Sequence, residues 1–577
     1  MLPLDRPRQL LRLSVLAAAV GLAAAGAAWV LVHLIGLLTN AFLFQRWGWD
    51  LPDFSELERT PLVVVVAVAG AGVVTLLAKW APVIRGHGIP EAMDAILNNQ
   101  SRIAPRTAIA KPASAAVAIG TGGPFGAEGP IIVTGGAIGS LLGQILHVSP
   151  SERKVLLASG AAAGMAATFG SPLAAVVLAI ELLLFEFSAR AFIPLVVATS
   201  VAGGAHAALF GSGPLFTVPD HHFSGLSELP TFAVVGLVCG LLATLIAKGL
   251  FVVEDLYRRL PVAETWHPMI GALAWASLGL LVPRALGVGY DVIDDALAGR
   301  LAVGALAALA AGKLVVWWIA LASGTSGGTL APILIISSTT GALLGHVASD
   351  LFPGMGLSPA SVALVAMAAT FGAAARAPFA AIVFMFELTR DYDAILPLML
   401  ATVLADLVAR ALLHDSLMTE KLTRRGVRVP ASYHADVLRT TSVASVMTRD
   451  VETLAAADSI DDADARFDVG HHSAYPVVDG EGRVVGIVAR GDALREELSG
   501  STLLRDLPER DLVTVTPTDT VVTALQRMLD EGVDHLPVLE DGRLVGICTR
   551  TDVLHARRRQ LEDERRQTGW LPRVLRD

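Results

Sequence analysis

The stretch GTGGPFGAEGPIIVTGG at residues 120–136 holds one acidic residue, Glu128, in a run otherwise built mainly from glycine, proline and apolar residues. The apolar residues after Pro130 predict a helix, and proline is well tolerated in the first turn of a helix. Glycines before that start let backbone N–H groups turn toward a ligand, and a helix N-terminus attracts anions. If the segment lies in a membrane, its ionisable residue is a functional candidate. The alternative is a structural carboxylate that caps the helix.

The distribution of charge places this stretch in a membrane. The chain has 577 residues, of which 53% are hydrophobic and only 17% charged. Of its 97 charged residues (44 Lys and Arg, 53 Asp and Glu), 45 lie in residues 429–577 and 52 in residues 1–428. The charged fraction is thus roughly 30% after residue 428 and roughly 12% before it, whereas a soluble domain is about 25% charged. This excludes a soluble enzyme and a disordered chain, and the net charge of −9 argues against a nucleic-acid partner.

The apolar run of residues 13–38 predicts a first spanning helix. It is much longer than the roughly 7–15 apolar residues of a signal peptide, which is the competing interpretation. Basic residues precede this run and follow the last apolar run, which predicts cytoplasmic termini and a multi-pass protein of the cell (inner) membrane in the lipid bilayer. The other apolar runs cover residues 61–80, 108–120, 131–147, 155–185, 191–210, 229–252, 268–283, 301–322, 330–349, 360–386 and 394–413.

The apolar part contains an internal repeat. MAATFG occurs at residues 165–170 and again at 367–372, an offset of 202 residues. The same offset relates GSLLGQ (139–144) to GALLGH (341–346), and an offset of 206 relates PLAAVVLAIE (172–181) to PFAAIVFMFE (378–387). Short, broken hydrophobic helices at matching places of two halves are typical of a transporter's binding site. We therefore predict a duplicated membrane unit, with halves at about residues 61–215 and 229–413.

Two further glycine-rich strings resemble the first: GHGIP at residues 86–90 and GGTLAP at 327–332. If several helix N-termini converge at the middle of the bilayer, they can replace the hydration shell of an anion without a lysine or arginine, which would hold it too tightly. Close helix packing through small residues is the alternative explanation. Two of the strings occupy equivalent positions in the repeat, which favours an anion site.

The C-terminal part carries a second repeat. AYPVVDGEGRVVGIVARGDAL (474–494) resembles HLPVLEDGRLVGICTRTDVL (535–554), and each predicts a strand, a turn, a strand and then a helix. The only cysteines, Cys239 and Cys548, lie in different parts of the chain, so neither a disulfide framework nor a thiolate metal site is predicted.

GHGIP, GPFGAEGP, GGTLAP and the segment SLMTEKLTRRG (416–426) resemble the signature segments of the CLC chloride channel and transporter family, and the C-terminal part resembles a pair of CBS domains. The resemblance implies an all-α polytopic membrane protein, built as an inverted repeat of broken and tilted helices, followed by an α/β CBS pair. It also implies a homodimer with one anion pathway per subunit, in which Glu128 is the gating glutamate. The anion-binding residues that it implies are His87, Gly88, Ile89, Gly126, Ala127, Gly129, Thr329, Leu330, Ala331 and Met418.

The predicted domains follow from this resemblance. They are a transmembrane anion-transport domain at residues 1–428, a linker at 429–441, CBS domains at 442–497 and 498–560, and a charged tail at 561–577.

The site departs from the usual family pattern. His87 replaces a serine and Met418 a tyrosine, so both familiar side-chain donors to a central anion are changed. Ala127 stands where a basic residue is usual, and Leu330 where phenylalanine is usual. A neutral imidazole can still donate one N–H. His87 is therefore either a donor to the anion or a cap of its helix.

Whether the protein is a channel or a proton-coupled antiporter depends on the residue that follows Glu181. Proton-coupled members of the family carry a glutamate where this chain has Leu182. This favours a passive chloride channel gated by Glu128 and pH, with a proton-coupled chloride or fluoride antiporter as the alternative. A divalent-cation transporter with CBS domains is a more remote alternative, and an enzyme is not predicted. Glu181 and Glu387, partners in the repeat, are expected to be structural.

The CBS pair raises the question of a cofactor. Asp492, Thr549 and Asp552 resemble residues that hold an adenine nucleotide, whereas Ala489 stands where Ser or Thr is common. We predict no required cofactor, with an adenine nucleotide as the candidate regulatory ligand. The pairs His221-His222 and His471-His472 are interpreted as solvated loop histidines rather than a metal site.

Overall fold

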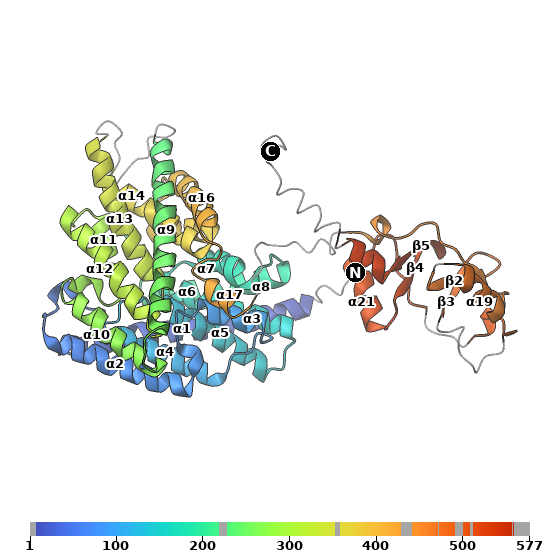
Figure 1. Cartoon of the computed structure of the whole chain (residues 1–577), viewed down its shortest axis with the longest axis horizontal. Coiled ribbons are helices and arrows are strands. Elements are labelled where there is room, and N and C mark those ends of the chain that lie inside the picture. The colour runs from blue at the N-terminus through green and yellow to red at the C-terminus, as the bar shows by residue number, and fades with distance from the viewer. Residues whose placement is uncertain are drawn as a thin grey trace. The chain divides into compact units, whose positions relative to one another are not determined.

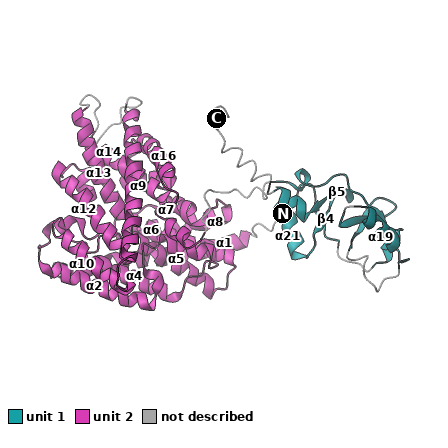
Figure 2. Ribbon diagram, viewed as in Figure 1, with its two compact units in different colours: residues 1–4, 434–577 teal, residues 5–433 magenta. Residues whose placement is uncertain are grey.

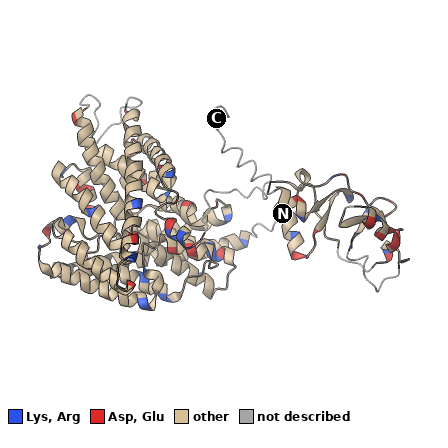
Figure 3. Ribbon diagram, in the orientation of Figure 1, with Lys and Arg blue, Asp and Glu red and all other residues tan. Residues whose placement is uncertain are grey.

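The computed structural model describes residues 7–218, 228–351, 358–427, 441–470, 472–490, 500–507, 512–556 and 558. The chain divides into a helical unit of residues 5–433 and a second unit that includes residues 434–577 (Figure 2). The boundary therefore lies five residues beyond the predicted end of the membrane domain. Charged side chains are sparse over the helical unit (Figure 3), as its composition requires.

The helical unit runs twice through one order of elements (Figure 1). The first pass contains α1 (Pro7–Leu43), α2 (Pro61–Trp80), α3 (Ile89–Leu97), α4 (Pro105–Gly120), α5 (Glu128–Ile145), α6 (Pro150–Phe169), α7 (Pro172–Ala179) and α8 (Ala189–Leu209). The second contains α9 (Leu229–Arg258), α10 (His267–Gly279), α11 (Tyr290–Leu297), α12 (Val303–Ala322), α13 (Leu330–Leu351), α14 (Pro359–Ala375), α15 (Pro378–Thr389) and α16 (Ile395–Leu412), and α17 (Glu420–Arg424) follows. The duplication therefore extends over both halves, including α1 and α9, which the sequence did not pair.

Seven helices in the described part of the chain are long and apolar enough to cross a membrane. The others are shorter because glycine and proline interrupt them. The apolar run of residues 155–185, for example, is two helices: Gly170 adopts a left-handed conformation at the end of α6, and Pro172 begins α7. The run of residues 360–386 breaks at Arg376 in the same way. The broken helices are those that the repeat predicted.

Close packing through small residues, the alternative explanation for the glycines, holds where α5 meets α6. A Cβ added to Gly135 would lie 2.1 Å from the carbonyl oxygen of Gly160, and one added to Gly139 would lie 2.0 Å from that of Leu156. These glycines let the two helices touch along their backbones. They belong to the packing of the unit rather than to its site.

The described residues of the second unit form two hairpins. In the first, β2 (Ala474–Val478) pairs antiparallel with β3 (Val484–Ala489), and β1 (Leu454–Ala455) joins β2 in parallel. In the second, β4 (His535–Glu540) pairs antiparallel with β5 (Arg543–Thr549). The helices α19 (Ile460–Val469) and α21 (Val521–Asp530) precede the two hairpins. The predicted strand–turn–strand pattern is confirmed in both copies.

The core of each CBS domain also contains a short segment from elsewhere in the unit. In sequence, that segment stands just before the repeat of the other CBS domain. Val443, which the sequence placed in the first domain, is buried in the core formed by Met528, Leu536 and other residues of the second. Leu504, which the sequence placed in the second domain, is buried in the core of the first. These two segments pack in the neighbouring core because each one extends away from its own repeat and pairs with its neighbour.

Candidate functional site

The three glycine-rich strings meet at one place. Gly86 donates its N–H to the carbonyl oxygen of Thr325 at 3.0 Å, and Gly328 donates its N–H to that of Gly126 at 2.9 Å. The starts of α3, α5 and α13, which follow these strings, are thereby held close together. The predicted convergence of glycine-rich helix starts is confirmed.

This meeting point leaves no room for side chains at its closest contacts. A Cβ added to Gly129 would lie 1.8 Å from the carbonyl oxygen of His87, and one added to Gly88 would lie 2.6 Å from that of Gly129. Gly88 also has φ +96°, a conformation that other residues rarely adopt. Both glycines are therefore required for the starts of α3 and α5 to approach one another.

We expect Gly129→Ala to destabilise the helical unit, because the new methyl group meets backbone that cannot rotate away. Overpacking of this kind costs about 1–3 kcal/mol or more. Thermal unfolding of the purified protein in detergent measures the effect. Gly136→Ala in the same helix is the control, since its Cβ would meet no heavy atom closer than 3.4 Å. An equal melting temperature for the two variants would contradict the close approach.

Glu128 lies at the centre of this arrangement and is 1% exposed. Its Oε1 accepts a hydrogen bond from the hydroxyl of Tyr290 at 2.7 Å, and its Oε2 is buried without a hydrogen-bond partner among the described residues. A Cβ added to Gly126 would lie 1.8 Å from Oε2, and one added to Gly328 would lie 2.7 Å from it. The carboxylate therefore occupies the space beside the starts of α5 and α13, where an anion would be stabilised.

Tyr290 is a site residue that the sequence analysis missed. It is the first residue of α11 and follows the string GVG at residues 287–289. Its ring lies between Phe169 and Phe216, each 6.2 Å away between ring centroids. The string matches GHG at residues 86–88 at nearly the repeat offset, and this match is the signal that would have revealed it.

Two buried lysines support the glycine-rich strings. Lys111 donates hydrogen bonds from Nζ to the carbonyl oxygens of Ile84 at 2.7 Å and Gly86 at 2.8 Å. Lys313, its partner in the repeat, donates to the carbonyl oxygen of Gly287 at 2.7 Å. Both side chains are fully buried. They fix the loops that precede α3 and α11.

His87 is 5% exposed, and its Nδ1 has no hydrogen-bond partner in the described part of the structure. It does not cap α3 with a side-chain hydrogen bond, because the N–H of Gly88 donates instead to Glu91 at 3.0 Å. The ring lines a cavity of about 10 Å³, which is room for about one water molecule. The capping alternative for His87 is therefore wrong, and an unpaired ring nitrogen is available at the site.

The remaining predicted anion-binding residues are also buried. Ile89 and Ala127 flank the meeting point at the starts of α3 and α5, and Thr329, Leu330 and Ala331 open α13. Met418 lies just before α17, and its N–H donates to the hydroxyl of Ser416 at 3.2 Å. Leu417 and Lys421, not Met418, are the residues of this segment that line the small cavity beside His87.

Glu181 and Glu387 have the structural role that was predicted. Glu387 accepts the N–H groups of Leu173 at 3.0 Å and Ala174 at 2.6 Å, at the start of α7. Glu181 accepts the N–H of Ala380 at 2.9 Å, at the start of α15. Each glutamate thus caps a helix of the other half. Leu182 is buried in the short π-helical segment, Ile180–Leu184, that follows α7.

The candidate nucleotide residues lie apart from this site, in the second unit. Oδ2 of Asp552 accepts hydrogen bonds from the N–H and the hydroxyl of Thr549, at 2.8 and 2.7 Å. Asp492 lies outside the described residues, as do His221, His222 and His471. The described residues hold no cluster of three or more side chains that could bind a metal ion.

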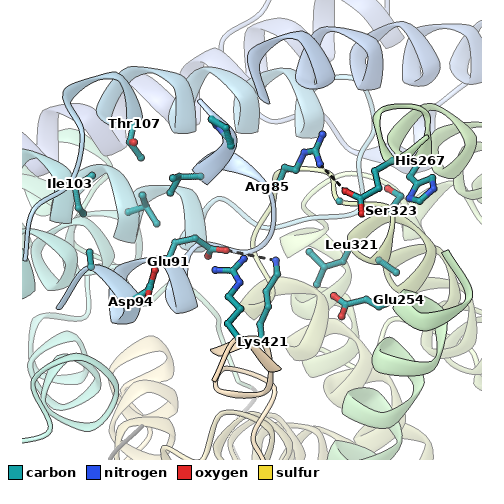
Figure 4. A pocket seen from close by; sticks show the side chains of 18 of the residues that line it. Arg85, Glu91, Asp94, Ile103, Thr107, Glu254, His267, Leu321, Ser323 and Lys421 are labelled. Carbon is teal, nitrogen blue, oxygen red and sulfur yellow. Dashed lines mark ion pairs between the residues drawn. The ribbon is translucent and has the colours of Figure 1, made fainter. Parts of the chain in front are cut away.

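A larger, open cavity of about 540 Å³ adjoins the small cavity that His87 lines (Figure 4). Charged side chains from α3, α9 and the segment around α17 line it. Glu254, Leu321 and Lys421 line both cavities, so the two meet at these residues. The open cavity therefore adjoins the small cavity that His87 lines.

Known proteins resemble both parts of the chain. Residues 62–410 match the sequence model described as voltage gated chloride channel, and residues 443–499 and 504–559 match that of the CBS domain. The H⁺/Cl⁻ exchange transporter ClcA of Vibrio campbellii is 30% identical over 412 residues, which are 69% of this chain and 87% of that protein.

Solved structures share the fold. A slow cyanobacterial Cl⁻/H⁺ antiporter is 26% identical with a TM-score of 0.63, and the match covers 73% of this chain and 98% of the other. A eukaryotic CLC transporter, 21% identical with a TM-score of 0.61, matches over 94% of this chain and 98% of its own. The predicted fold class is confirmed.

Proposed function

Because the chain belongs to the voltage gated chloride channel family, we propose that it exchanges chloride for protons across the membrane. The observation that carries this proposal is the position of Glu128. Its buried carboxylate lies where the starts of α5 and α13 would hold an anion, and one oxygen has no hydrogen bond from a described residue. A carboxylate that competes with chloride and also binds a proton links the two movements.

The sequence favoured a passive channel, because Leu182 supplies no proton-accepting group. The relatives support the exchange alternative better than the channel: the curated relative is named an H⁺/Cl⁻ exchange transporter, and a solved relative a Cl⁻/H⁺ antiporter. The charged route of the larger cavity, which reaches His87 without passing Leu182, supports the same choice. In this proposal the protein lies in the cell membrane as a homodimer with cytoplasmic termini, and the CBS pair is regulatory.

The proposal is tested with the purified full-length protein in lipid vesicles. A chloride gradient should drive protons uphill, and dissipation of the membrane potential should not abolish this movement. Chloride flux without uphill proton movement would establish the passive channel instead. Parallel measurements with fluoride and nitrate determine which anion the site accepts, because His87 and Met418 remove the two usual side-chain donors.

A further inference from the structure

The carboxylate of Glu254 lies where the two cavities meet. It belongs to α9 and lines the large open cavity together with Glu91 and Lys421 (Figure 4). It also lines the small cavity that contains His87. Its side chain is half-buried. Of the described acidic residues that line the open cavity, only Glu254 also borders the small cavity beside His87.

The other carboxylates of the larger cavity are already engaged. Glu91 accepts the N–H of Gly88 at 3.0 Å and faces Lys421 at 3.7 Å. Glu264 pairs with Arg85 at 3.7 Å, and Asp94 accepts a hydrogen bond from Asn98 at 2.7 Å. Glu254 makes neither a hydrogen bond nor an ion pair with any residue that the structure describes. It is therefore free to bind and release a proton without breaking a structural contact.

We propose that Glu254 is the group that takes up protons from the cavity and passes them toward Glu128. This inference rests on the proposed exchange of chloride for protons. Leu182 has no group that can accept a proton. The inference assigns the role of inner proton acceptor to Glu254, which lies on a different helix.

The transfer needs only O–H and N–H bonds. A proton from cavity water binds a carboxylate oxygen of Glu254 and leaves it neutral. Glu254 then releases that proton through a water molecule in the small cavity to a ring nitrogen of His87, and Glu254 becomes a carboxylate again. A histidine ring can accept a proton on one nitrogen and release one from the other. The carboxylate of Glu128 is the final acceptor, and no other bond changes.

Charged groups of both signs surround Glu254. Lys421 and Glu91 line the same cavity (Figure 4), and on α9 Asp255 is the next residue and Arg258 lies one turn further along. Arg424 of α17 pairs with Asp255 at 2.8 Å, and His87 lies in the adjoining small cavity. Lys421, Arg258 and Arg424 favour the charged form of Glu254, whereas Glu91 and Asp255 favour its neutral form. The mixed surroundings are suited to a group that must change its charge during every cycle.

The test compares Glu254→Gln with the wild type in vesicles that report chloride and proton fluxes separately. We expect proton transport to fall about tenfold or more, while chloride flux stays within about twofold, because glutamine keeps the size of the side chain. Glu254→Asp should recover part of the proton transport. Glu264→Gln, which lines the same cavity, is the matched control and should keep the wild-type ratio of protons to chloride.

The outcomes separate this inference from the proposed function. If the wild type drives protons uphill and Glu254→Gln does so at the same ratio, the inference is overturned and the exchange function stands. If the wild type moves no protons, the exchange function fails, and this inference fails with it. If Glu254→Gln melts at the wild-type temperature but loses chloride and proton flux together, Glu254 belongs to the anion path and the inference is also overturned.

Discussion

Glu128→Ala should abolish proton transport while chloride still flows. The wild-type carboxylate occupies the space between the starts of α5 and α13, and Oε2 lies where a substituent on Gly126 would be. Alanine leaves that space open to chloride and supplies no group that can bind a proton. We expect proton transport to fall about a hundredfold or more, and chloride flux at neutral pH to equal or exceed the wild-type value.

The same variant should lose its response to pH. In the wild type, chloride flux should rise as the pH falls from about pH 7 to about pH 4.5, because protonation neutralises Glu128 and lets it leave the anion's place. In Glu128→Ala the flux should stay level over this range. A variant that kept the wild-type response would show that another group gates the pathway.

Glu387→Gln is the matched control for both measurements. Glu387 is also an acidic residue on an apolar helix, but its oxygens accept two N–H groups at the start of α7. Glutamine can keep only part of this cap, so the protein should lose about 1–3 kcal/mol of stability. Its coupling of protons to chloride should stay unchanged. The comparison separates loss of a gate from loss of a structural contact.

The repeat and the three glycine-rich strings predicted the centre of the site from sequence. Glycine before a proline-containing helix start is a local pattern, and an offset shared by several strings shows that the pattern occurs twice. Tyr290 was missed because GVGY lacks the proline that marks GHGIP, although GVG matches GHG at nearly the repeat offset. Its hydroxyl reaches Glu128 across 162 residues of sequence, and a contact of that range depends on how α5 and α11 pack.

Glu254 was missed for a related reason. It follows a long apolar run, and in sequence it resembles an ordinary charged residue at the end of a spanning helix. Only the fold places it beside Lys421 and in the same cavity as His87. The CBS hairpins, in contrast, were predictable because their strands and turns are local. The exchange of Val443 and Leu504 between the two cores is a tertiary arrangement that no local pattern marks.

Tyr290→Phe should remove the hydrogen bond that keeps the carboxylate of Glu128 in the anion's place, and so raise chloride flux at neutral pH. The substitution removes the hydroxyl that donates to Oε1 at 2.7 Å and leaves the ring between Phe169 and Phe216. A hydrogen bond to a charged group contributes about 1.5–3 kcal/mol, which corresponds to roughly a tenfold to hundredfold change in the competition between carboxylate and chloride. Half-saturation by chloride should therefore occur at a lower concentration, measured as flux or by calorimetric titration.

A double variant shows whether the effect passes through Glu128. In the Glu128→Ala background the tyrosine hydroxyl has no carboxylate to hold, so Tyr290→Phe should add no further change in chloride affinity. Tyr257→Phe is the control: this tyrosine is also buried, but it packs against the ring of His267, so loss of its hydroxyl should leave chloride affinity unchanged in both backgrounds. Equal effects of Tyr290→Phe with and without Glu128 would mean that the hydroxyl acts on the anion itself.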